Sequence, residues 1–168
     1  MRRKREESGA ALVEFALLLP VFMALILGMF SGGVAYNQKL DLTHATREGA
    51  RYGAAVSKDT AFASGTWASN VKSLLVDRAS GDLSGSGVTT CVALVTGPPG
   101  STAVVANPPT APTGNYYSTN GSPCFTDTTS DAGMRVQVQV SRPSKIEALF
   151  FSWGITLNAK ATARYEGS

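Results

Sequence analysis

A long uncharged run, residues 15–38, constrains this chain more than any other feature of its sequence. As an α-helix rising about 1.5 Å per residue it would be roughly 36 Å long, and a bilayer's hydrocarbon core is about 30 Å thick. The core helix of a soluble protein is rarely apolar on every face over such a length. The run therefore predicts a helix that crosses a membrane close to the N-terminus.

A basic cluster before this run predicts the orientation of the chain. It consists of Arg2, Arg3, Lys4 and Arg5. Lys and Arg are enriched on the cytoplasmic side of membrane helices, so we expect a cytoplasmic basic leader over residues 1–9. A transmembrane helix over 10–38 would follow, and then an exterior domain over 39–168. The cytoplasmic (inner) membrane is the expected location, with a single pass.

The rest of the chain has no basic stripe of the kind that binds nucleic acid, and the formal net charge is only +3. We therefore expect no nucleic-acid partner.

A cleaved secretory signal peptide is the main alternative to a permanent anchor. Residues 33–35 offer a small-x-small pattern, and a cut after Ala35 would release a secreted domain. The apolar region of such signals is usually about 7–15 residues long, which is shorter than this run. The charge of Glu14 near the start of the apolar region also argues against a signal peptide. Pro20 is tolerable in a membrane helix, where it would produce a kink.

Glu14 is the unexpected residue in this segment. A charged side chain costs roughly 2.5–3.5 kcal/mol at the centre of a membrane helix on insertion scales, and less near the interface. The carboxylate either marks the start of the helix at headgroup depth or has a function that requires a partner. Its own position does not distinguish the two.

The residues around Glu14 resemble a known pattern. Residues 9–20 (GAALVEFALLLP) resemble the class III signal of type IV pilin-like proteins, and more specifically a TadE-like protein of the tight-adherence (Flp) pilus. The resemblance implies that prepilin peptidase cuts between Gly9 and Ala10, which makes Glu14 the fifth residue of the mature chain. It also implies that Glu14 pairs with the new N-terminal amine of a neighbouring subunit. Such a pair would set the register between subunits more than it would add stability.

Two further stretches resemble the same family. Residues 45–54 (ATREGARYGA) are similar to the segment that follows the anchor, and residues 155–166 (ITLNAKATARYE) to the last strand. The resemblance implies a minor pilin or pseudopilin that takes part in assembling a Flp (Tad) type IV pilus for adhesion or secretion. The implied partners are prepilin peptidase, other pilins, the Tad assembly platform and membrane lipid. The alternative is a single-pass membrane protein whose exterior loop binds a ligand, with no pilus role.

The residue patterns of the exterior part, residues 39–168, predict an α+β domain. Trp67, Val71, Leu74 and Leu75 would form one apolar face of a second helix over residues 66–79. Residues 88–95, 134–141 and 155–165 favour strands, and the alternation in 134–141 is that of a half-buried strand. Residues 144–147 form a capping-box pattern that predicts a short helix or turn. The fold class is therefore a long helix and a second helix with a small antiparallel sheet, which resembles the pilin plan.

Small residues follow the anchor at four-residue spacing, at Ala45, Gly49 and Gly53. They permit close approach of another helix or a sheet. We favour packing against the protein's own sheet over a subunit interface. Glu48 and Arg51 are spaced so that they can form an ion pair on one helix face.

Cys91 and Cys124 bracket a long loop over residues 97–123 that is rich in Pro, Gly, Ser, Thr and Asn. If this part is exported, a disulfide is the natural expectation, and the alternative is two free, buried thiols. Two cysteines and one distant histidine, His44, cannot make a tetrahedral zinc site. Since no nucleophile motif or phosphate-binding loop is present either, we expect no catalysis, no metal and no cofactor.

Overall fold

The structure is a computed structural model that describes residues 3–56, 67–79, 83, 85–95, 104–106, 123–126, 133–148 and 151–166. The chain divides into two compact units, each described by itself below. The first contains Met1–Asn37 and Ser144–Ile155, and the second contains Gln38–Pro143 and Thr156–Ser168. Most of the predicted loop over residues 97–123 lies outside the described residues.

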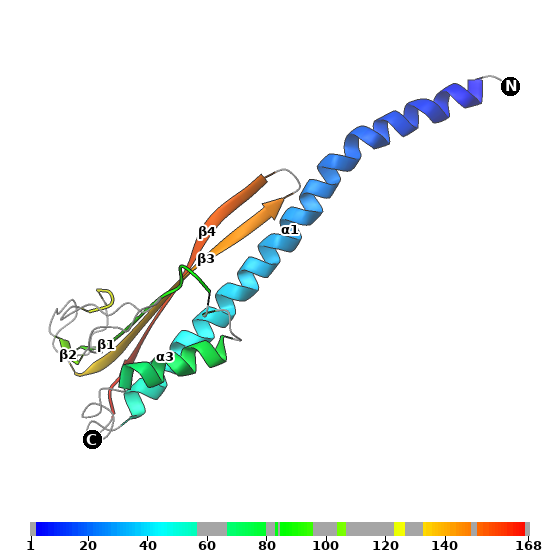
Figure 1. The fold of residues 1–168 in the computed structure, drawn as a ribbon. Coiled ribbons are helices and arrows are strands. Elements are labelled where there is room, and N and C mark those ends of the chain that lie inside the picture. The colour runs from blue at the N-terminus through cyan, green and yellow to red at the C-terminus, as the bar shows by residue number, and fades with distance from the viewer. Residues whose placement is uncertain are drawn as a thin grey trace. The chain divides into compact units, whose positions relative to one another are not determined.

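The described elements confirm the α+β fold class (Figure 1). In the described part of the chain, the helices α1 and α3 precede a four-stranded sheet in the order β2-β1-β3-β4. Their bounds are α1 Arg3–Ala55, α3 Trp67–Arg78, β1 Thr89–Val95, β2 Val104–Ala106, β3 Arg135–Ala148 and β4 Phe151–Arg164. The predicted second helix is present, and two predicted strands are longer than their alternating patterns indicated.

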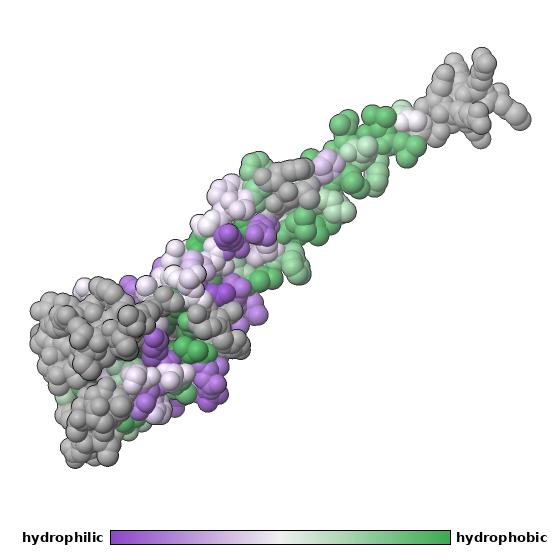
Figure 2. All heavy atoms as spheres, viewed as in Figure 1, coloured by the Kyte–Doolittle hydropathy of each residue, from purple (hydrophilic) through white to green (hydrophobic). Residues whose placement is uncertain are grey.

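The first unit contains the apolar part of α1. Its large hydrophobic side chains are exposed between Leu12 and Phe30, which are themselves 69% and 71% exposed (Figure 2). Pro20 lies inside the helix. The helical stretch Gly9–Ala55 contains a window of mean hydropathy 2.5, none of which is buried within the chain. An all-round apolar and uncovered helix of this length fits a single-pass membrane anchor.

The core of the second unit lies on one face of its sheet. The antiparallel register places Val92 opposite Val138 and Leu94 opposite Val136, so these side chains share a face. A Cβ placed on Gly53 of α1 would lie 3.2 Å from Val136, so this face meets the helix. Figure 1 shows α1 and α3 on the same side of the sheet. The branched side chains between helices and sheet are therefore the core of this unit.

Before β1, the chain turns through Gly87, whose φ is +83°. Residues with a Cβ rarely adopt this conformation. A Cβ there would also lie 3.1 Å from the ring of Pro143. Glycine at this position therefore lets the chain enter β1 close to β3.

The sheet differs from the prediction on its other face. The alternating pattern places Arg135 and Gln137 on a solvated side, yet they are only 2% and 1% exposed. The segment 123–126 explains part of this burial, because Cys124 and Phe125 bind Gln137 directly. Alternation identified the two faces of β3 correctly, but it could not show that a distant segment covers the polar one.

The predicted helix or turn over residues 144–147 is wrong. These residues continue β3, with Ser144 and Ile146 half-buried and Lys145 and Glu147 exposed. That two-residue period is the period of a strand. β4 pairs alongside β3 and supplies backbone hydrogen bonds that a four-residue capping pattern cannot anticipate.

Candidate functional site

Gly9, Ala10 and Glu14 all lie within α1. Ala10 and Glu14 are four residues apart, which places them on the same face of the helix and about 6 Å apart along its axis. Both side chains are exposed. This face is thus open to another molecule along the whole first turn that would follow a cut at Gly9.

The Gly9–Ala10 peptide bond lies inside a helix in this structure. A peptidase that requires an extended backbone must therefore unwind the helix locally. Glycine lowers this cost, because it destabilises a helix interior by about 0.5–1 kcal/mol relative to alanine. A Cβ on Gly9 would meet no atom within 4 Å, so packing does not explain the glycine here.

Glu14 is exposed on the apolar part of α1, and no ion pair involves it among the residues whose side chains are described. A carboxylate within a membrane-spanning helix requires a cationic partner or water. In a chain beginning at Ala10, Glu14 would lie near the positive end of the helix dipole rather than a few turns inside it. Cleavage would therefore change both the helix field at Glu14 and the cations available to it.

In the second unit, an exposed groove runs between α1 and α3. Its volume is about 700 Å³, and it is lined by His44, Arg47, Glu48, Arg51, Tyr52, Leu74 and Arg78. The spacing of residues on α1 suggested Arg51 as the partner of Glu48. Instead, Glu48 forms an ion pair with Arg78 of α3 at 2.9 Å. Both side chains are about half exposed, so the pair contributes at most about 1 kcal/mol. His44 is exposed, as an ordinary residue of the helix surface would be.

The small-residue stripe packs within the unit. A Cβ on Gly49 would lie 2.7 Å from the Leu75 side chain, and one on Gly53 would lie 3.1 to 3.3 Å from Val71, Val136 and Trp67. Gly53 therefore allows the sheet to approach α1 closely, as the sequence favoured, whereas Gly49 allows the approach of α3, which was not the expected partner. They do not present an open face to another subunit.

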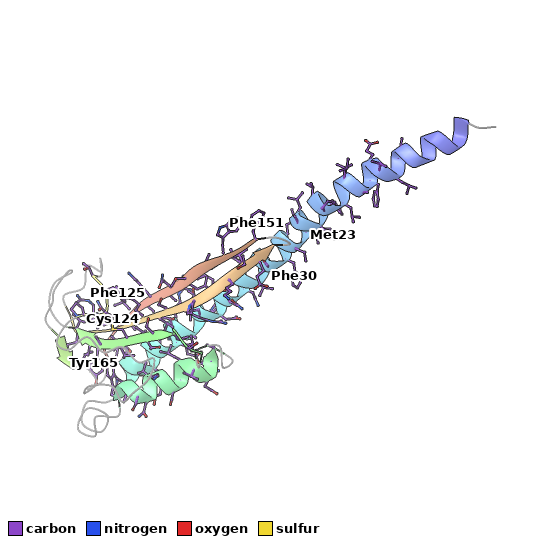
Figure 3. All side chains as sticks on the ribbon, turned by 45° about the horizontal axis from the view of Figure 1, so that its top comes forward. Met23, Phe30, Cys124, Phe125, Phe151 and Tyr165 are labelled. Atoms are coloured by element: carbon purple, nitrogen blue, oxygen red, sulfur yellow. A yellow bond between two sulfur atoms is a disulfide. The ribbon has the colours of Figure 1, made fainter. Side chains whose placement is uncertain are left out.

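The structure joins Cys91 of β1 to Cys124 by a disulfide, with the sulfur atoms 2.04 Å apart. Gln137 fixes the same segment: its Oε1 accepts from the Cys124 N–H at 3.0 Å, and its Nε2 donates to the Phe125 carbonyl at 3.0 Å. Lys160 of β4 lies 5.2 Å from the centre of the Phe125 ring. The C-terminal end of the predicted loop is thereby anchored to the sheet (Figure 3).

The sequence did not single out Gln137 or the aromatic pair Phe151 and Trp153. Gln137 has no local signal, because its role depends on a segment that arrives from elsewhere in the chain. For the pair, two aromatics spaced as alternate residues of a strand were the available signal. Within the described ranges, no group of three or more His, Cys, Asp or Glu side chains could hold a metal ion.

Comparison with known proteins finds a similarity in the first part of the chain. The family model of TadE-like proteins matches residues 9–51. The predicted resemblance is confirmed over that range, which includes Gly9, Ala10 and Glu14, and it indicates a protein associated with the Tad pilus. No curated protein matches the chain, and no solved structure matches it either.

Proposed function

We propose that this chain, a TadE-like protein over residues 9–51, is a minor pilin or pseudopilin that prepilin peptidase processes between Gly9 and Ala10. The observation that carries the proposal is the position of Glu14 on an exposed helix that fits a membrane anchor. The match of this segment to the TadE-like family supports it. The mature protein would take part in assembly of a Flp (Tad) pilus, with other pilins and the Tad assembly platform as partners.

The proposed orientation places the N-terminus in the cytoplasm and the second unit outside the cytoplasmic membrane. The basic residues before the helix support this orientation. The Cys91–Cys124 disulfide supports it independently, since disulfides persist in exported domains and are rare in the cytosol. The chain's role is structural rather than catalytic in this proposal.

In the proposed mechanism, the peptidase acts on the chain while it is in the membrane. The helix unwinds at Gly9, because glycine stabilises a helix less than most other residues do. Cleavage of the Gly9–Ala10 peptide bond then leaves a charged amine on Ala10. The Glu14 carboxylate of one subunit then pairs with the Ala10 amine of its neighbour. Packing between subunits would remove water from both charges, so each offsets the other's desolvation only when the subunits are in register.

The mature N-terminus tests the proposal. Mass spectrometry of the protein purified from its own host should find a chain that begins at Ala10. A Gly9→Val variant should retain Met1, whereas Gly28→Val, at another uncrowded glycine of the same helix, should still be processed. A wild-type chain that keeps Met1 would contradict processing, and one that begins at Tyr36 would show secretion after Ala35 instead.

A further inference from the structure

We propose that the joined ends of β3 and β4 lie in the interfacial layer of the same bilayer that α1 crosses, through Phe151 and Trp153. They would lie in the leaflet opposite the N-terminus. This inference rests on the membrane anchor of the proposed function and adds a second, independent contact with lipid. It also specifies where α1 leaves the hydrocarbon core.

The two aromatic side chains form one exposed surface. Phe151 and Trp153 are alternate residues of β4, so they project from the same face of the strand. Their rings stack with centroids 5.8 Å apart and planes 12° apart, and each residue is 63% exposed. Figure 3 shows Phe151 projecting on the side of the hairpin away from α1. Stacking thus combines two large apolar groups that the unit itself does not cover.

A hydrogen bond fixes the level of this surface along α1. The backbone N–H of Glu147 donates to the Ser31 hydroxyl oxygen at 3.2 Å. A groove of about 320 Å³ between α1 and β3 is lined by Leu27, Phe30, Ser31, Val34, Lys145 and Glu147. All of these residues belong to the first unit, so the aromatic pair and the anchor helix share one compact body.

Charged residues show that the level of Ser31 does not lie inside the hydrocarbon core. Lys145 and Glu147 are exposed on β3 beside Ser31, and the membrane centre disfavours such charges strongly. At about 1.5 Å per residue, Ser31 lies roughly 32 Å along the helix from Ala10, close to the core thickness of about 30 Å. The hydrocarbon span therefore ends near Ser31, and residues 32–38 lie beyond it although they are uncharged.

These positions match the chemistry of the lipid interface. Amphipathic Trp rings are enriched at headgroup level, and lysine side chains extend toward the polar layer. The apolar window of α1, in the same compact unit as the aromatic pair, is itself wholly unburied within the chain. A bilayer that surrounds this helix at the level of Ser31 meets Phe151 and Trp153 without any further partner.

Tryptophan fluorescence tests the inference, because the chain has two tryptophans and the other, Trp67, is buried in the second unit. The full-length protein is reconstituted in phosphatidylcholine–phosphatidylglycerol vesicles with lipids brominated near the glycerol end of their acyl chains. The brominated lipids should strongly quench the emission of Trp153, and this emission should be blue-shifted relative to that of tryptophan in water. The Trp153→Phe variant should lose this quenched component and retain the unquenched emission of Trp67.

A second reporter separates failure of this inference from failure of the anchor. Phe22→Trp in the Trp153→Phe background should be quenched by lipids brominated deep in the acyl chains. If that reporter is quenched and Trp153 is not, the anchor stands and the interfacial contact is overturned. If neither is quenched, the anchor itself is wrong, and the contact falls with it. Trp153 shielded from both bromolipid and aqueous acrylamide would show that another protein copy covers it, which also overturns the inference.

Discussion

The indole Nε1–H of Trp67 donates a hydrogen bond to the backbone carbonyl of Gly53 at 2.9 Å. That carbonyl belongs to the last turn of α1, where the helix itself offers no partner. Two other groups bind the same end: Glu166 N–H donates to the Ala54 carbonyl at 3.0 Å, and the Tyr165 hydroxyl donates to the Val56 carbonyl at 2.7 Å. The second helix and the C-terminus together complete the end of the first helix.

Replacing Trp67 by Phe should lower the free energy of unfolding by about 1–3 kcal/mol. The ring remains apolar, but the buried Gly53 carbonyl loses its donor and bears the desolvation cost. Chemical unfolding in detergent, followed by circular dichroism, measures the change. Trp153→Phe is the matched control, because Trp153 is exposed and its replacement should change this free energy by less than about 0.5 kcal/mol. Equal effects of the two substitutions would refute the role given to the indole.

Gly49→Ala should destabilise the second unit by about 1–2 kcal/mol. Its new methyl group would meet Leu75 at 2.7 Å, and Leu75 is fully buried, so overpacking outweighs the gain in helix propensity of about 1 kcal/mol. In a Leu75→Ala background the same methyl group enters the vacated space. There Gly49→Ala should stabilise the protein, and a double-mutant cycle measures this reversal of sign. Additive effects would show that the close contact carries no energy.

Removing the disulfide with Cys91→Ala and Cys124→Ala should lower stability by about 3–4 kcal/mol. The bond closes a loop over a sequence separation of 33, and the chain-entropy model gives this magnitude for such a loop. Thermal unfolding with and without reductant measures the effect. Reductant should destabilise the wild type and leave the double variant unchanged. An insensitive wild type would contradict a disulfide that stabilises the sheet.

Glu14→Gln should abolish or strongly reduce pilus assembly while leaving cleavage after Gly9 intact. The amide keeps the size of the side chain and removes the charge that the Ala10 amine would pair with. Electron microscopy counts the pili, and mass spectrometry confirms the mature N-terminus in the same cells. Glu14→Asp retains the charge and should restore part of the assembly. Normal assembly by Glu14→Gln would show that the pair is dispensable.

The sequence by itself determined the elements whose signals are local. The uncharged run before Lys39 predicted the long helix, because the length of an apolar segment follows directly from the bilayer's thickness. The side chains of Val136, Val138 and Val140 predicted a strand, because a period of two fixes which residues share a face. The spacing from Gly9 to Glu14 supported the family resemblance for the same reason: it is read along a few consecutive residues.

Only the tertiary structure decided how these elements cover one another. Gln137 lies on the polar half of an alternating strand, and it is buried because Cys124 and Phe125 arrive from another part of the chain. Ser144 begins a capping pattern, yet pairing with β4 keeps it in a strand. Tyr165 completes the end of a helix more than a hundred residues earlier. Such contacts depend on which segments meet in space, and local patterns of hydrophobicity carry no information about that meeting.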